Sequence, residues 1–84
     1  MINSDFKQWL FSNTTYSNRV VSNTISRLKR ADRMHPVRLE EVYLFELEHT
    51  DEFNCLSVTV KSQIRKAVKL YFQYAKSEVV EENK

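Results

Sequence analysis

The feature that most restricts the fold of this chain is the absence of glycine: none of its 84 residues is a glycine. Two-residue hairpin turns depend on glycine for positive φ angles, so a fold rich in β-hairpins is disfavoured. Phosphate-cradling loops of the G-x-G-x-x-G and P-loop kinds need it too, as does the nucleophile elbow G-x-S-x-G. The composition therefore excludes these motifs and favours helices joined by short polar turns.

Length and composition indicate one small domain without a disulfide framework. The 42% of hydrophobic residues in the chain suffice for one modest core. Its only cysteine, Cys55, cannot form an internal disulfide. No apolar run approaches the roughly 20 residues of a membrane span, and the polar start MINSDFKQ is not typical of a signal peptide. We therefore expect a protein of the reducing cytoplasm.

Hydrophobic spacing predicts a compact all-α bundle of four helices in residues 1–77. The first begins at Asn3 or Ser4, ends near Phe11 and has one apolar face. The third is a short helix within 38–53, although the alternation over 42–47 also permits a strand. A loop is expected over 50–56, and the charged tail 78–84 is expected to fray. The apolar face of the first helix holds Phe6, Trp9 and Leu10.

The second and fourth helices are the most clearly amphipathic. The second is expected over 18–34, with Ser17 as its N-cap and Pro36 ending it, and the fourth over 57–77, beginning at Ser57. On a helical wheel the apolar side of the second helix holds Val20, Val21, Thr24, Leu28 and Ala31, with Ile25 at its margin. That of the fourth holds Val60, Ile64, Ala67, Val68, Tyr71, Phe72 and Ala75.

Charge is segregated along the chain, although its formal sum is only +2. The second helix holds five basic residues and one acidic residue, and the fourth holds five basic residues and none acidic, which together give +9. Residues 39–53 between them hold six acidic residues and no basic one. Helices with so few acids forgo the ion pairs of ordinary solvated helices. Either these helices contact nucleic acid, or the acidic segment or a partner neutralises them.

The pattern of the two amphipathic helices resembles a known family. Tyr16-Ser17-x-x-Val20-x-x-x-Thr24-x-x-x-Leu28, and then Leu56-Ser57-x-x-Val60-Lys61-x-x-Ile64-Arg65-Lys66-Ala67-x-x-x-Tyr71-Phe72-x-Tyr74, is similar to the N-terminal core-binding domain of tyrosine recombinases and phage integrases. The resemblance extends from Phe6 to Ala75. It departs from the family at Val20 and Val60, where threonine is usual.

This resemblance implies a four-helix, SAM-like fold that binds duplex DNA through its second and fourth helices. The catalytic arginines, histidine and tyrosine of the family lie in a separate C-terminal domain that these 84 residues do not include, so the resemblance implies that this part binds DNA without strand cleavage. The implied contact residues coincide with the basic faces: Arg19, Asn23, Ser26, Arg30, Arg33, Ser62, Arg65, Lys66, Lys69, Gln73 and Lys76. Groove edges would be read by Asn23, Arg30, Arg65 or Gln73.

Catalytic and metal-ligating patterns are weak. His49 lies near two acids and Cys55, but the spacing matches no zinc motif, so we expect no metal and no cofactor. His35 is interpreted as a helix-end residue and Cys55 as a small core residue. Tyr71 and Tyr74 lie on or near an apolar face, where packing is the simpler account. We therefore do not expect an enzyme.

Two questions stay open at the level of sequence. The acidic segment of one copy could dock on the basic helices of another, giving a homodimer, or a protein partner could supply the acids. The chain is also compatible with a complete small protein or with a piece of a longer recombinase-like protein.

Overall fold

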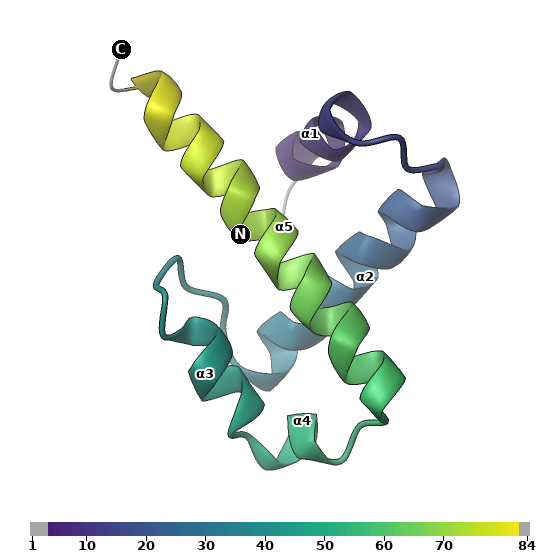
Figure 1. The fold of residues 1–84 in the computed structure, drawn as a ribbon, viewed down its shortest axis with the longest axis vertical. Helices are drawn as coiled ribbons and strands as arrows, with labels where there is room; N and C mark the ends of the chain where they lie inside the picture. Colours follow the sequence, from purple (N-terminus) through teal and green to yellow (C-terminus); the bar gives the residue numbers. More distant parts are fainter. Residues whose placement is uncertain (1–3, 83–84) are drawn as a thin grey trace.

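The computed structural model describes residues 4–82, with side chains from 5 to 76, and contains no strand in that part (Figure 1). Helices make up 76% of the structure, which confirms the expected compact all-α fold. Five helices are present in the described residues, one more than expected: α1 (Ser4–Asn13), α2 (Asn18–Met34), α3 (Tyr43–Glu48), α4 (Asp51–Asn54) and α5 (Val58–Glu82).

The two long helices start with the same serine cap. The Ser17 Oγ accepts a hydrogen bond from the Val20 N–H at 3.3 Å, and the Ser57 Oγ accepts one from the Val60 N–H at 3.2 Å. Each cap satisfies one of the N–H groups that the first turn of a helix leaves without a partner. The start of α2 at Asn18 and its end at Met34 are confirmed, and α5 starts one residue after its expected start.

We predict that removing either cap destabilises the domain. Ser17→Ala and Ser57→Ala should each lower the free energy of unfolding by about 1 kcal/mol, because one first-turn N–H loses its acceptor. Urea denaturation followed by circular dichroism measures this change. Ser12→Ala, an exposed serine inside α1 that caps nothing, is the matched control. An effect of Ser12→Ala equal to that of the cap variants would contradict the capping account.

The acidic segment folds as two short helices rather than as a strand. Within 38–53, α3 confirms the predicted short helix. The expected loop over 50–56 instead contains α4, a single turn capped by Thr50, whose Oγ accepts from the Phe53 N–H at 3.2 Å. This turn places the Phe53 side chain in the core, where it is 1% exposed.

The first and last helices, α1 and α5, extend beyond their expected C-terminal ends. Helix α1 continues to Asn13, whose side chain donates to the Trp9 carbonyl at 3.0 Å. Helix α5 continues to Glu82, five residues past the expected end at Ser77. Asn3, the alternative start of the first helix, and the last two residues of the expected frayed tail lie outside the described residues.

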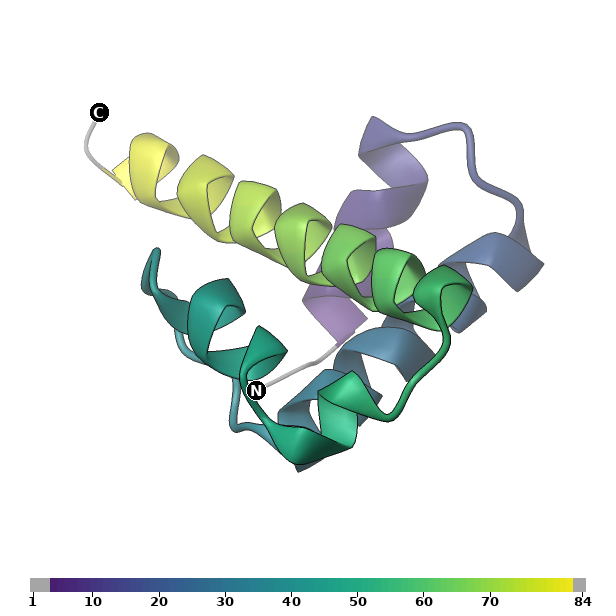
Figure 2. The same ribbon diagram turned by 60° about the horizontal axis from the view of Figure 1, so that its bottom comes forward.

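The core is built where α2 and α5 cross, with α1 and the acidic segment closing its two sides (Figures 1 and 2). Helix α1 contributes an aromatic cluster: the Phe6 ring meets the Tyr71 ring edge-on at 5.2 Å, and Trp9 lies 6.0 Å from Tyr74. The apolar face predicted for α1 therefore packs into the core, with Phe6 and Leu10 fully buried and Trp9 half-buried. The fully buried side chains of the core are Phe6, Leu10, Val21, Leu28, Ala31, Tyr43, Leu47, Ile64 and Val68.

Tyr43 fastens the acidic segment to the end of α2. Its ring is fully buried and stacks on the His35 ring at 5.2 Å, and its hydroxyl donates to the His35 carbonyl at 2.6 Å. Burial, with a smaller contribution from the Asp32 carboxylate, raises the pKa of Tyr43 to about 12. The neutral phenol is therefore the form that holds α3 against α2.

Candidate nucleic-acid interface

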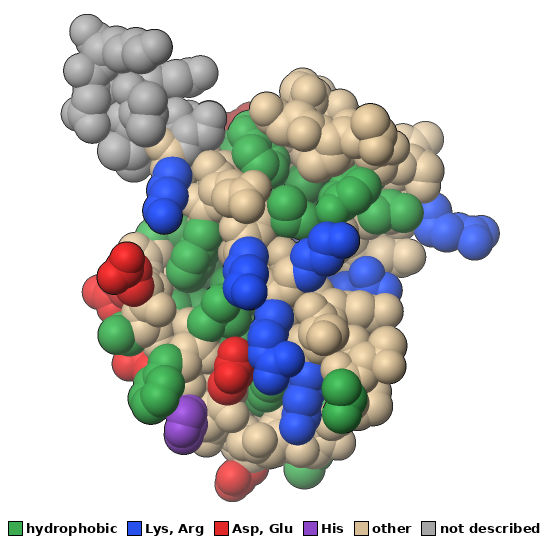
Figure 3. All heavy atoms as spheres, in the orientation of Figure 1, with side chains coloured by type: hydrophobic (Ala, Val, Ile, Leu, Met, Phe, Trp, Pro, Cys, Tyr) green, Lys and Arg blue, Asp and Glu red, His purple; other side chains and the backbone are tan. Residues whose placement is uncertain are grey.

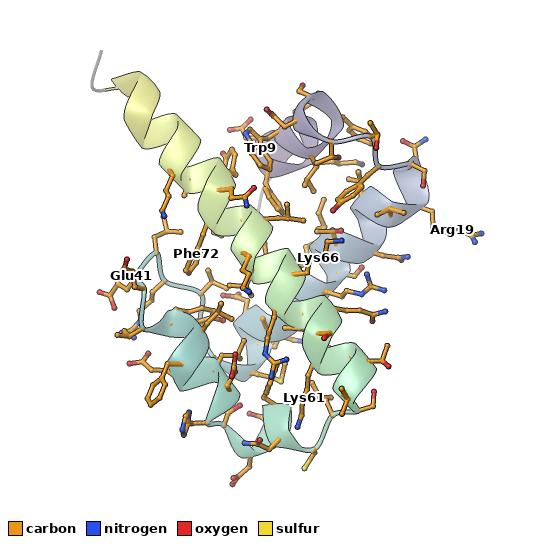
Figure 4. The ribbon with its side chains drawn as sticks, in the orientation of Figure 1. Trp9, Arg19, Glu41, Lys61, Lys66 and Phe72 are labelled. Carbon is orange, nitrogen blue, oxygen red and sulfur yellow. The ribbon has the colours of Figure 1, made fainter. Side chains whose placement is uncertain are left out.

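Helix α5 carries basic side chains along its length: Lys66, Lys69 and Lys76 are exposed, and Lys61 and Arg65 are half-buried at the edge of the core. We call Lys61, Arg65, Lys66, Lys69 and Lys76 the α5 basic row. Figure 3 shows Lys and Arg side chains gathered along this helix, and Figure 4 shows Lys61 and Lys66 on that face. From Lys61 to Lys76 the row is about 22 Å long, at 1.5 Å of rise per residue. Ser62 and Gln73, both exposed, lie among these cations as predicted.

Aromatic rings beneath the row hold three of its cations in place. Lys61 Nζ lies 5.9 Å from the centre of the Phe53 ring, and the Arg65 guanidinium lies 5.5 Å from the same ring. Lys66 Nζ lies 5.7 Å from the centre of the Tyr16 ring, just before α2. Such contacts restrict the side chains without cancelling their charge. Lys61 was predicted as a basic residue of this helix but not as a DNA contact, because its wheel position borders the apolar face.

The contact residues predicted on α2 are all exposed. They are Arg19, Asn23, Ser26, Arg30 and Arg33. Arg27, which was not among the predicted contact residues, is half-buried. It lies on the same side of the helix as Asn23 and Arg30, four residues after Asn23 and three before Arg30. Its spacing from these two residues was the available signal. Arg19 extends from the start of α2 at the edge of the molecule (Figure 4).

The fold brings together only part of the predicted site. Helices α2 and α5 pack through their buried stripes, so the positions opposite those stripes turn in different directions. On the face in Figure 3, the basic side chains over α5 continue onto the neighbouring part of α2.

The acidic segment neutralises little of this surface. Glu48 accepts a hydrogen bond from Arg65 Nε at 2.9 Å, and this is the only ion pair in the described residues between a carboxylate and a cation of α2 or α5. The other acids that form pairs turn elsewhere: Glu46 contacts Arg38 and His35, and Glu40 contacts Arg38 at 3.5 Å. The hydrogen bond from His35, together with Arg38, lowers the pKa of Glu46.

The single acidic residue of α2, Asp32, also forms its hydrogen bond outside the basic faces. The Asp32 carboxylate accepts a hydrogen bond from the Val37 N–H at 2.8 Å, across the turn that contains Pro36. It stabilises the reversal of the chain after α2 rather than neutralising a neighbouring arginine. The positive charge of α2 therefore faces solvent.

Groups with possible catalytic or metal-binding chemistry are dispersed. His49 Nδ1 donates to the Phe45 carbonyl at 2.7 Å, and no group of three His, Cys, Asp or Glu side chains suited to a metal occurs among residues 5–76. Cys55 is exposed at the end of α4, so its expected core role was wrong: Phe53 is buried and Leu56 is half-buried on either side of it. Tyr71 and Tyr74 pack against Phe6, as expected.

Comparison with protein-family models, curated proteins and solved structures found no match to this chain. No helix in the described part of the chain is both long and apolar enough to cross a membrane.

Proposed function

We propose that this protein is a non-catalytic DNA-binding domain that contacts the phosphates of duplex DNA through α2 and the α5 basic row. One observation carries the proposal. Apart from Arg65, no lysine or arginine on either helix is paired with a carboxylate in the described part of the chain. Unpaired cations beside short polar side chains suit a phosphate backbone, because charge supplies affinity and hydroxyl or amide groups add hydrogen bonds.

Three of the four side chains expected to read bases are exposed, and the charged one, Arg30, forms no ion pair in the described residues. Arg30 can donate two hydrogen bonds to guanine, and Asn23 or Gln73 can form the corresponding pair with adenine. The fourth, Arg65, is held by Glu48 on one side and by the Phe53 ring below it. We therefore assign base contacts to Arg30, Asn23 and Gln73, and a positioning role to Arg65.

We further propose that the fold is of the SAM-like, core-binding kind found in tyrosine recombinases and phage integrases. The matched serine caps of α2 and α5, and the short acidic helices between them, support this assignment. On this proposal the domain binds DNA, and another domain or another protein cleaves the strand.

Salt dependence tests the proposal directly. Fluorescence anisotropy with a labelled DNA duplex should show binding at low salt that weakens steeply as the salt concentration rises. If about five phosphates are neutralised, the slope of log K against log salt concentration is about −4 to −5. Light scattering on the free protein tests the alternative of acidic-to-basic self-association. A salt-sensitive dimer without affinity for DNA would overturn the proposal.

A further inference from the structure

A second surface, separate from the basic one, exposes hydrophobic side chains on and before α3. Phe45 is 66% exposed, Leu39 is 59% exposed and Val42 is 51% exposed. Isolated exposed hydrophobic residues are ordinary, but three within seven positions form a patch. The other large exposed hydrophobic side chains of the described chain lie apart from them, on other helices: Phe11, Val20 and Val58.

The patch is held in place by the packing of α3. Tyr43 and Leu47 bury the inner side of this helix, which turns Val42 and Phe45, three positions apart, to the outer side. The His49 ring lies 4.2 Å from the Phe45 ring and supports one edge of it. Figure 3 shows hydrophobic side chains exposed over this part of the molecule, with acidic side chains beside them.

The border of the patch is acidic. Glu40 and Glu41 lie between Leu39 and Val42 in the sequence, and both are exposed. Glu40 is paired with Arg38 at 3.5 Å, so the unpaired negative charge beside the patch is that of Glu41. Glu41 forms no ion pair within the described chain, and it extends outward from the loop before α3 (Figure 4). This charge repels a phosphate backbone, and it also disfavours the pairing of two copies through the same patch. The charge therefore selects a basic partner.

The basic surface of a second copy does not fit this patch. Val20 and Val58 are exposed there, but they are single residues near the starts of two different helices, and the side chains exposed among the cations farther along α5, such as Ser62 and Gln73, are polar. A fitting partner needs apolar side chains on one face of a helix and basic ones along its flanks. We propose that Leu39, Val42 and Phe45 form a docking site for a basic amphipathic helix of another protein. This site leaves the α5 basic row free for DNA.

A peptide pair tests the proposal. A fluorescein-labelled helical peptide with leucine on one face and lysine on the other should bind the protein, and the same peptide with glutamate in place of lysine should not. Amide shifts in NMR spectra should map to residues 39–49. The variant Val42→Ser/Phe45→Ser should weaken binding by about tenfold or more, because both apolar anchors are lost. Val58→Ser, another exposed hydrophobic residue outside the patch, should leave binding unchanged.

Three results would overturn the proposal. One is equal binding of the lysine and glutamate peptides, and another is unchanged binding by Val42→Ser/Phe45→Ser. The third is a dimer of the wild-type protein in light scattering that this variant abolishes, since the occupant would then be a second copy. The variant should still bind a DNA duplex like the wild type, so loss of the peptide site and loss of the DNA site are distinguishable.

Discussion

The double variant Arg30→Glu/Lys69→Glu is expected to lose most of its affinity for duplex DNA. Both side chains are exposed, and neither forms an ion pair in the described part of the chain, so each is available to a phosphate. Replacing a cation by a carboxylate removes one attraction and adds one repulsion. The slope of log K against log salt concentration should become shallower by about 2, and affinity at low salt should fall by about a hundredfold.

Two controls separate charge from structure. Arg30→Lys/Lys69→Arg keeps both charges and should bind DNA within a few-fold of the wild type, apart from any bidentate base contact of Arg30. Lys7→Glu reverses an exposed cation on α1, outside the proposed interface, and should change affinity less than Lys69→Glu alone. All variants should keep the helical circular dichroism spectrum. Wild-type affinity in Arg30→Glu/Lys69→Glu would exclude these helices as the DNA surface.

The experiment is needed because a sequence specifies charge more directly than it specifies pairing. The basic faces of α2 and α5 follow from helical periodicity alone. The ion-pair partners of the acidic residues do not follow from periodicity. Glu46 pairs with His35 and Arg38 only because the chain reverses after α2 and returns beside it. That reversal depends on the bond from the Val37 N–H to Asp32, a contact between side chain and backbone that no periodicity encodes.

The helix boundaries likewise divide into those that the sequence predicts and those that depend on tertiary contacts. Helix α2 could be bounded from the sequence because a serine cap precedes it and Pro36 follows it. Helix α4 could not, because one turn carries no periodic signal and forms where Thr50 caps it and the core accepts Phe53. Similarly, Lys61 and Arg65 were predicted as surface cations, but their position over the Phe53 ring depends on α4 lying beneath α5.

Tyr43→Ala is expected to have the largest effect on stability of any single substitution in the acidic segment. The ring is fully buried, stacks on His35 and lies 6.2 Å from the Phe72 ring, so its removal leaves a cavity between α2, α3 and α5. Truncation of a buried aromatic residue costs about 3–5 kcal/mol. The total stability of a chain of 84 residues is roughly 4–13 kcal/mol, so much of it should be lost. Urea denaturation at neutral pH measures the change.

Tyr43→Phe distinguishes the hydroxyl from the ring. It keeps the packing but leaves the His35 carbonyl without its 2.6 Å donor, so it should lower the free energy of unfolding by only about 1–2 kcal/mol at neutral pH.

At high pH the wild type should lose its advantage in stability over Tyr43→Phe. Because the pKa of Tyr43 rises from 10.0 to about 12 on folding, the unfolded chain releases the phenol proton first as pH rises. Wild-type stability should therefore fall between pH 10 and 12 by about 2 kcal/mol more than that of Tyr43→Phe. Parallel alkaline losses in the two proteins would show that the buried phenol does not hold α3 to α2 in the way that its geometry indicates.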